Sequence, residues 1–471
     1  MTFVQIEFVW FYLTIFVLYW SFAKYRRAQN LLLAVGSAVF YGWIHPWFLI
    51  LLYSSAVLDY FCGRGMAENP SRKRLFLTLS MCGNLGMLGY FKYMDFFLEN
   101  VIASFDLLGM STSVHTLGIF LPVGISFYTF QTMSYTIDIY RGDIEPRKNF
   151  LDYVVFISFF PQLVAGPVER ASNLLPQMEK PREFDLDQVR SGFGLAMWGA
   201  FKKVAIADTI APYVDKIFML DDPSFPLVWL GGIGFSLQIL ADFSGYTDIA
   251  RGTARMLGIN LMLNFDNPYI SKSPSEFWRR WHISFSSWIS DYVYRPLRGS
   301  WRGFWAFAWA STGAMLLSGL WHGASWNFVM FGAWFAVMAV VYRLGEPLIP
   351  DSIKEMRGAG LAAIALNYWI TVVAMIVFRE PSLARSISHF QQSPFNVSVD
   401  DWAAATVIFW VMFGLALPQL IALAMEKTGV MKQIEDSPWF LPAQTTVWML
   451  FAMCIFSFVR VSANDFIYFQ F

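Results

Sequence analysis

Apolar segments recur along nearly the whole sequence, and this feature limits the folds open to the chain more than any other. The first extends from Phe3 to Phe22 and contains one charged residue, Glu7. Hydrophobic residues make up 56% of the 471 residues and charged residues only 14%, whereas soluble domains carry roughly 25% charged residues. One water-soluble core cannot bury so much apolar surface, so we expect the chain to lie in a lipid bilayer.

The spacing of these segments predicts an all-α, multi-pass membrane protein. A span needs about 20 apolar residues, which gives about 11 tilted or re-entrant segments. After the first, the apolar segments are Leu31–Ile44, Trp47–Phe61, Leu75–Tyr90, Leu117–Ile137, Phe150–Val168, Gly192–Val204, Leu227–Leu240, Gly303–Tyr342, Leu361–Phe378, Trp402–Met425 and Thr445–Phe458. The largest polar connections are 169–190 and 379–402, and we expect the first to be a solvated or interfacial loop.

The cations that follow the first segment indicate its orientation. Lys24, Arg26 and Arg27 come after the apolar stretch, whereas a cleaved signal peptide carries its cations before it. We therefore expect a retained transmembrane helix. The positive-inside rule then places these cations in the cytoplasm and the N-terminus outside it.

Charge and cysteine content exclude several classes of function. The formal net charge is zero, so the chain has no overall basic field for nucleic acid. Cys62, Cys82 and Cys454 are scattered, without metal-ligand spacing or a disulfide pattern, and we expect them to be small buried hydrophobes. No internal repeat is visible, which disfavours an inverted-repeat transporter.

The segment between Arg302 and Arg343 contains the strongest candidate for chemistry. Of the 40 residues between these arginines, His322 is the only ionisable one. Forty residues exceed one span, so the chain must break, tilt or turn within this stretch, and Gly319 and Gly323 are suitable places for irregular backbone. An ionisable residue at membrane depth indicates a function. The alternative is a neutral histidine that hydrogen-bonds a backbone carbonyl and packs on a neighbouring tryptophan.

A second candidate region is rich in tryptophan and arginine, and it contains His282. Six cations fall within about 30 residues, a pattern that suits the membrane interface. They are Lys272, Arg279, Arg280, Arg295, Arg298 and Arg302. Such a patch can bind a phosphorylated ligand such as coenzyme A, or it can contact anionic lipid headgroups. The sequence does not single out one arginine.

A third candidate follows the apolar run Leu227–Leu240, where Asp242, Tyr246 and Asp248 lie close together. Carboxylates at the end of a membrane segment need partners. They either pair with arginines of the 279–302 region or help to hold a hydroxylated acceptor. We expect the other histidines, His45, His115 and His389, to be structural or solvated.

These regions resemble the membrane-bound O-acyltransferase family, most closely its bacterial branch of alginate O-acetyltransferases. Seven motifs occur in the family's order, and the resemblance is good over roughly residues 1–345. The motifs are Leu121–Tyr128, Tyr135–Gly142, Val164–Val168, Asp242–Tyr246, Asn267–Tyr269, Glu276–Ser284 and Gly319–Gly323. The resemblance implies one membrane domain over 1–471, with a catalytic core at roughly 117–345 and helices around a transmembrane tunnel.

The resemblance also implies the site and the reaction. The family's signature histidine falls on His322, and its second polar position, often His in this branch and often Asn elsewhere, falls on His282. A thioester donor such as acetyl-CoA enters from the cytoplasm, and no cofactor stays bound. Weaker candidates for binding substrate are Asp242, Tyr246, Arg279, Arg280, Trp281, Trp321 and Asn327.

Chemistry agrees with these roles, because an imidazole can take a proton from an alcohol as it attacks a thioester. The sequence therefore predicts an acetyltransferase of the bacterial inner membrane that acts on an exopolysaccharide with a periplasmic or membrane-anchored, acetylesterase-like partner. Alternatives are a lipid or carrier-protein acceptor, or a polysaccharide transporter or scaffold without chemistry.

Overall fold

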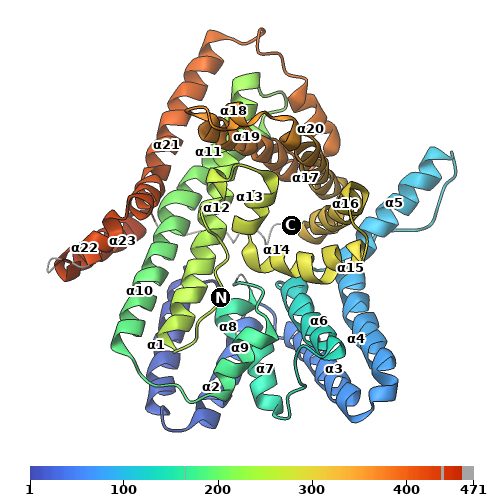
Figure 1. Cartoon of the computed structure of the whole chain (residues 1–471), viewed down its shortest axis with the longest axis vertical. Helices are drawn as coiled ribbons and strands as arrows, with labels where there is room; N and C mark the ends of the chain where they lie inside the picture. Colours follow the sequence, from blue (N-terminus) through green and yellow to red (C-terminus); the bar gives the residue numbers. More distant parts are fainter. Residues whose placement is uncertain (165, 436, 438–439, 459–471) are drawn as a thin grey trace. The chain divides into compact units, whose positions relative to one another are not determined.

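A computed structural model describes residues 1–164, 166–435, 437 and 440–458 of the chain (Figure 1). Within these residues the regular secondary structure is helical and includes no strand. The prediction of an all-α fold is thus confirmed. One residue of the 164–168 motif, Ala165, lies outside the described residues.

The chain divides into two compact units. Unit 1 comprises Met1–Phe193 and Ala250–Met262, and unit 2 comprises Gly194–Ile249 and Leu263–Phe471. The chain passes between them within α10 (Leu186–Phe201), within α12 (Phe225–Met256) and after Met262. The candidate residues His282 and His322 both belong to unit 2.

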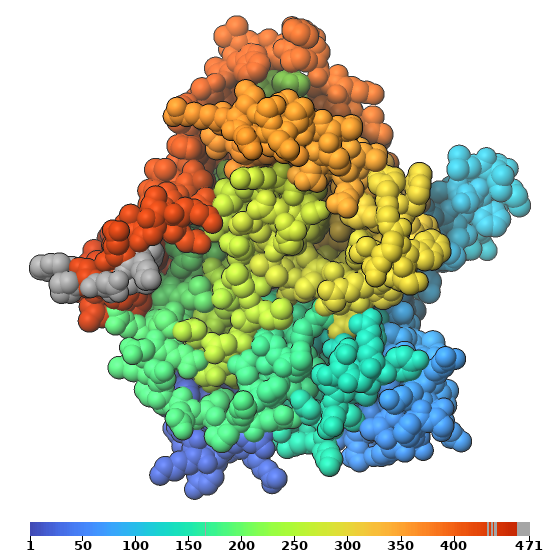
Figure 2. All heavy atoms as spheres, viewed as in Figure 1, coloured from blue at the N-terminus to red at the C-terminus, as the bar shows by residue number. Residues whose placement is uncertain are grey.

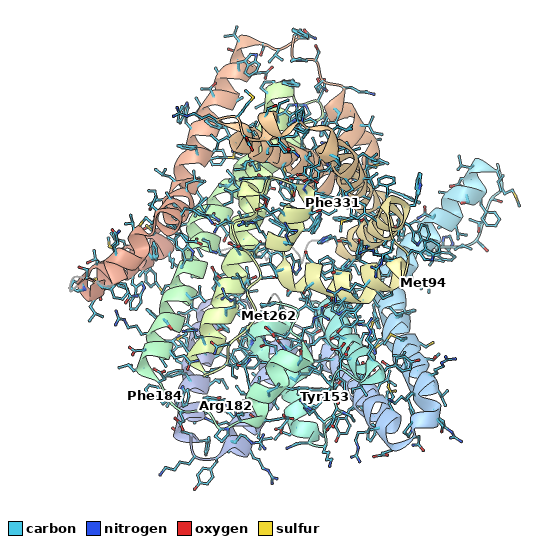
Figure 3. All side chains as sticks on the ribbon, viewed as in Figure 1. Met94, Tyr153, Arg182, Phe184, Met262 and Phe331 are labelled. Carbon is cyan, nitrogen blue, oxygen red and sulfur yellow. The ribbon has the colours of Figure 1, made fainter. Side chains whose placement is uncertain are left out.

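Unit 1 is built from short and medium helices that pack through aromatic side chains. Its helices are α1 (Ile6–Ser21), α2 (Arg26–Gly42), α3 (Phe48–Glu68), α4 (Lys73–Leu88), α5 (Met94–Leu107), α6 (Ile125–Arg141), α7 (Phe150–Ser158), α8 (Phe160–Leu163) and α9 (Ala171–Glu179). Tyr153 of α7, labelled in Figure 3, is fully buried, and its ring lies 4.7 Å from that of Tyr135 in α6. Helices α3, α4 and α6 pack against one another.

Unit 2 contains the longest helices together with several very short ones. Besides α12 they are α11 (Asp208–Met219), α13 (Pro274–Arg280), α14 (Ile283–Ile289), α15 (Arg295–Arg298), α16 (Phe304–His322), α17 (Trp326–Gly345), α18 (Asp351–Lys354), α19 (Ala359–Arg379), α20 (Leu383–Phe390), α21 (Val399–Thr428), α22 (Val430–Glu435) and α23 (Phe440–Phe458). The short helices α13 and α14 carry the Trp- and Arg-rich region.

Five of the described helices are long and apolar enough to cross a membrane. They are α12, α19, α21, α23 and the segment Trp326–Leu348, which begins with α17. Apolar side chains of α21 and α23, such as Trp410 and Phe456, are exposed, and Figure 2 displays both helices at the surface in red-orange. Such exposure fits contact with lipid. The number of about 11 membrane segments stays a prediction.

Helix boundaries agree with several predicted segments and correct others. The apolar runs Leu31–Ile44 and Trp47–Phe61 lie in α2 and α3. Of Leu117–Ile137, only the part from Ile125 onward is helical, because Pro122 and Gly124 interrupt the backbone before it.

The prediction for the first of the two polar connections was wrong in part. The 169–190 connection includes helix α9, and its charged residues Glu169 and Arg182 are buried rather than solvated. The 379–402 connection includes α20, in which His389 is buried. Polar residues in a sequence therefore do not distinguish a solvated loop from a buried polar network.

Candidate active site

Helices α16 and α17 form a tight hairpin that ends α16 at His322. The chain leaves the helix at Gly323 in an extended conformation and re-enters helix at Trp326, so the predicted break is confirmed. The helices approach closely at two glycines. A Cβ atom on Gly319 would lie 2.1 Å from Phe328 O, and one on Gly332 would lie 2.2 Å from Met315 O. Larger residues at these positions would push the hairpin apart.

The imidazole of His322 is buried among aromatic rings. It is 3% exposed. Its ring centroid lies 5.6 Å from that of Phe285 in α14, 5.6 Å from that of Phe331 in α17 and 5.4 Å from that of Phe378 in α19. Phe331 is labelled in Figure 3. Three helices therefore fix the orientation of this side chain and keep bulk water away from it.

His282 lies at the junction of α13 and α14, in a conformation unusual for a residue with a Cβ atom. Its φ angle of 43° is in the left-handed region, and its side chain is fully buried. The carbonyl of His282 accepts a hydrogen bond from Ser286 N at 2.8 Å, which begins α14. Strained backbone of this kind persists only where the surroundings hold it, and it clusters at functional sites.

Asn264 fixes the tautomer of His282. Its Oδ1 atom accepts hydrogen bonds from Ser284 N at 3.3 Å and from Ser284 Oγ at 2.9 Å. A backbone N–H can only donate, so this atom of Asn264 is the oxygen. The Nδ1 atom of His282 lies 3.1 Å from the same oxygen and must carry the proton. The Nε2 atom therefore presents its lone pair.

His282 is neutral at physiological pH. It lies outside the five candidate membrane-spanning helices. Burial lowers its pKa well below the usual 6.5, and the neighbouring His322 lowers it further. The neutral imidazole is the form that acts as a base.

The structure brings the two predicted histidines together, which the sequence could not show. Both imidazoles contact the ring of Phe285, with centroids 4.9 Å away for His282 and 5.6 Å away for His322. Both also contact Trp321, at 6.0 Å and 5.1 Å. Phe285 is a site residue that the sequence analysis missed, because a phenylalanine in an apolar chain carries no signal of its own.

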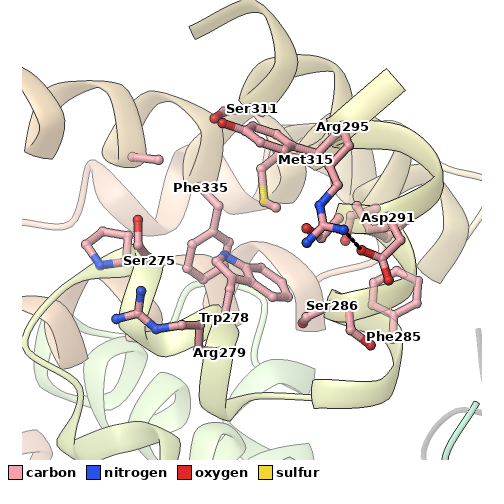
Figure 4. A pocket seen from close by; sticks show the side chains of 18 of the residues that line it. Ser275, Trp278, Arg279, Phe285, Ser286, Asp291, Arg295, Ser311, Met315 and Phe335 are labelled. Atoms are coloured by element: carbon pink, nitrogen blue, oxygen red, sulfur yellow. Dashed lines mark ion pairs between the residues drawn. The ribbon is translucent and has the colours of Figure 1, made fainter. Parts of the chain in front are cut away.

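A cavity of about 650 Å³ is lined by Phe285 of this group, but not by His282, Trp321 or His322 (Figure 4). Phe285 and Ser318 form part of its wall, and Ser318 stands one helical turn before His322. The wall is mixed, with aromatic groups, several serine hydroxyls and the cations Arg279 and Arg295. A ligand with an apolar part, hydrogen-bonding groups and a negative charge matches this lining.

The cavity distinguishes among the arginines of the basic patch. Arg280 forms ion pairs with Glu276 at 3.0 Å and Asp266 at 3.4 Å, and its function is structural at least in part. Arg295 pairs with Asp291 at 3.0 Å, as the dashed line in Figure 4 marks. Arg279 lines the cavity, and its guanidinium makes no ion pair with any residue that the structure describes.

Asp242 and Tyr246 belong to a buried lysine network, which corrects the predicted pairing with arginines. The Nζ atom of Lys203 lies 2.8 Å from Asp242 and 2.7 Å from Asp208, and it stands over the ring of Tyr246 at 5.6 Å. Two adjacent lysines inside the predicted apolar segment Gly192–Val204 were the signal for this network. Removal of one partner from an ion pair of this depth is strongly destabilising, because it leaves an uncompensated buried charge.

Two further candidates also have structural contacts. The side-chain amide of Asn327 donates to Glu380 O at 2.6 Å and to Val377 O at 3.3 Å, at the C-terminus of α19. Asn327 thereby anchors the start of α17 beside Phe378. Trp281 is buried and stacks on Phe277 at 5.6 Å.

Glu380 was missed as part of this anchor. Its buried carboxylate contacts Arg385 Nε at 3.0 Å and His389 Nε2 at 2.5 Å. Because Glu380 and His389 lie in a polar connection of the sequence, only the fold reveals that they are packed inside the protein.

Comparison with known proteins identifies similar chains. The sequence profile of the membrane-bound O-acyltransferase family matches residues 144–378. The probable alginate O-acetylase AlgI of Azotobacter vinelandii is 35% identical over 100% of both chains. A peptidoglycan O-acetyltransferase of Helicobacter pylori is 34% identical, over 69% of this chain and 66% of its own. A teichoic acid D-alanyltransferase of Bacillus subtilis is 28% identical, over 54% of this chain and 65% of its own.

Proposed function

Because this chain belongs to the membrane-bound O-acyltransferase family, and is therefore a multi-pass membrane O-acyltransferase, we propose that it moves acetyl groups from a cytoplasmic thioester to an extracytoplasmic polysaccharide. The observation that carries the proposal is the buried pair formed by His282 and His322 around Phe285. Relatives named for alginate and peptidoglycan O-acetylation support a polysaccharide acceptor. Localisation in the bacterial inner membrane follows from a cytoplasmic donor and an external acceptor.

His322 acts as the general base in this proposal. It removes the proton from an acceptor hydroxyl as the oxygen attacks the thioester carbonyl. The C–S bond then breaks, and the thiolate takes up the proton from the imidazolium. Base catalysis of this kind contributes about 10²–10⁴ in rate. Exclusion of water by the rings around His322 limits hydrolysis of the donor.

His282 assists through Nε2, the ring nitrogen that carries no proton in its tautomer. That atom can accept a hydrogen bond from the acceptor hydroxyl and hold it for attack. Because its pKa is lowered, His282 stays neutral and does not repel the imidazolium that forms on His322.

The cavity of Figure 4 receives the donor in this proposal, and acetyl-CoA fits its lining best. Arg279 is the cation available for a phosphate, because Arg280 and Arg295 already have acidic partners.

Replacement of Arg279 by Ala should raise KM for acetyl-CoA about 10-fold or more, since a charge-assisted hydrogen bond contributes ~1.5–3 kcal/mol. KM for S-acetyl-N-acetylcysteamine, which lacks phosphates, should not change. Arg295→Ala is the matched control. Equal effects of Arg279→Ala on both donors would argue against a phosphate contact.

The decisive experiment compares glycan acetylation in cells carrying His322→Ala, His282→Ala or His115→Ala, with the level of membrane-inserted protein measured in parallel. His115 lies exposed in a loop and serves as the control. Loss of acetyl groups with normal protein level for the first two variants would support the proposal. Unchanged acetylation in His322→Ala would exclude it. We also expect a periplasmic or membrane-anchored, acetylesterase-like partner protein to work with this chain, so deletion of such a partner should abolish glycan acetylation.

A further inference from the structure

The cavity of Figure 4 follows one stripe of helix α16 toward His322. The residues of α16 in its wall recur at helical spacing, so they share one face of the helix. They are Phe307, Ser311, Ala314, Met315 and Ser318. From Phe307 to Ser318 this stripe extends about 16 Å along the helix axis. The next position of the stripe is His322, one turn beyond Ser318. The cavity thus leads along α16 to the imidazole that acts as the base.

Phe285 of α14 stands at the His322 end of this cavity. Its ring is part of the cavity wall, whereas His282, Trp321 and His322 are not. The centroid of the ring lies 5.6 Å from that of His322 and 4.2 Å from that of Trp321. Phe285 is 1% exposed, so close packing holds the ring in place. A molecule that extends from the cavity toward His322 therefore meets the ring of Phe285.

Further aromatic rings border the imidazole of His322 without belonging to the cavity wall. Phe331 and Phe378 both contact His322, and their own ring centroids lie 5.1 Å apart. Phe328 packs on Phe378 at 4.9 Å. Rings packed in this way leave little space beside the imidazole, and a larger group has to displace them at a cost in free energy.

We propose that Phe285 determines the length of the acyl group that this enzyme transfers, a role that rests on the proposed function and on binding of the donor in this cavity. The thioester carbonyl has to reach His322, and the acyl group is the leading end of the donor. That group therefore enters between Phe285 and the other rings around His322. A methyl group displaces the ring of Phe285 least, and every further methylene group displaces it more. Phe285 accordingly favours acetyl over longer acyl groups.

The experiment measures acyl transfer by the full chain in inverted membrane vesicles from cells that make the acceptor glycan. The donor is acetyl-CoA or butyryl-CoA, and glycan-bound acyl groups are released with alkali and quantified. The measured quantity is the ratio of kcat/KM for butyryl-CoA to kcat/KM for acetyl-CoA. In the wild type this ratio should be about 0.1 or less, because one extra methylene group in a tight apolar site changes kcat/KM by about 10–200-fold.

Phe285→Ala should raise this ratio about 10-fold or more, because the space of the ring becomes available to the longer acyl group. A loss of folded protein alone would lower both rates equally and leave the ratio unchanged. Phe285→Leu should shift the ratio in the same direction, and it provides the result if Phe285→Ala does not accumulate. Phe307→Ala is the matched control, because Phe307 lines the other end of the α16 stripe. It should leave the ratio at its wild-type value, whatever its effect on the absolute rates.

Three results would overturn this role of Phe285 while the proposed function stands. The first is a wild type that uses butyryl-CoA as well as acetyl-CoA. The second is an unchanged ratio in both Phe285 variants, measured with detectable acetyl transfer. The third is an equal rise in Phe307→Ala, since the cavity as a whole would then set the acyl length. Wild-type vesicles that contain the protein but transfer neither acyl group would instead overturn the proposed function, and the role of Phe285 with it.

Discussion

Asn264 orients His282, although it was not recognised as a site residue in the sequence. Its side-chain oxygen accepts hydrogen bonds from His282 Nδ1, Ser284 N and Ser284 Oγ. An asparagine has no distinctive sequence signal, and its partner lies 18 residues away. The fold alone brings the two together.

Replacement of Asn264 by Leu should lower kcat for acetyl transfer by about 10²-fold with little change in KM, because His282 loses its fixed tautomer. Steady-state kinetics with acetyl-CoA would measure this. Ser284→Ala is the matched control, since it removes one bond to the same oxygen but none from His282. A purely structural effect of Asn264 would instead lower protein yield and leave kcat per folded molecule unchanged.

Ionisation of the buried Glu169 should make the stability of the protein depend on pH. Burial raises the pKa of Glu169 to about 7, although Met262 N and the Asn173 amide donate to its carboxylate. The unfolded chain has the usual value of 4.5. Between these pH values the folded chain binds the proton more tightly than the unfolded chain does. The contribution of this proton to the free energy of unfolding is therefore complete below pH 4.5 and is lost as the pH rises to 7.

Replacement of Glu169 by Gln should therefore remove roughly 1–3 kcal/mol of pH-dependent stability between pH 5 and 8. Melting temperatures across this range would measure it, with the exposed Glu183→Gln as control. If the variant keeps the full pH dependence, another group is responsible.

At the scale of helices, close contact between α16 and α17 depends on Gly319 and Gly332. A methyl group at either position meets backbone atoms of the opposite helix, which cannot move aside cheaply. Gly319→Ala and Gly332→Ala should each lower the free energy of unfolding by about 1–3 kcal/mol. They should also lower activity, because His322 ends α16.

Gly345→Ala is the control for these two variants, since a methyl group there meets nothing within 4 Å. Thermal unfolding and acetyl transfer would be measured for all three. Equal melting temperatures for the three variants would show that the glycines do not set the distance between the helices.

Sequence reasoning predicted elements better than it predicted their contacts. The break within 303–342 followed from length alone, and the structure places it at Gly323. Lys203, by contrast, seemed to belong to an apolar segment, and its pairing with Asp242 depends on packing that no local pattern contains. The meeting of His282 and His322 was implied only by family resemblance, because the two lie 40 positions apart in the chain.

For the whole molecule, the cations after α1 predict the topology. Gln5 and Lys24 flank the helix, and both are exposed. The 16 residues of α1 extend about 24 Å, somewhat less than the hydrocarbon thickness of about 30 Å. If α1 crosses the membrane, the two residues lie on opposite sides, with Lys24 in the cytoplasm.

Labelling of single cysteines would test this topology in a Cys82→Ser background, because Cys82 is exposed. A membrane-impermeant thiol reagent should label Gln5→Cys in intact spheroplasts, and Lys24→Cys only after permeabilisation. Labelling of both without permeabilisation would mean that α1 lies along the interface.

The left-handed backbone at His282 has a consequence for variation at this position. Its φ of 43° is tolerated by glycine, asparagine, aspartate and histidine, and it is strongly disfavoured by β-branched or bulky side chains. The resemblance to the family implies that His and Asn alternate there, and both residues meet this conformational requirement. A substitution survey at position 282 would thus report backbone tolerance together with chemistry. Asn is the replacement that removes the imidazole while keeping the turn intact.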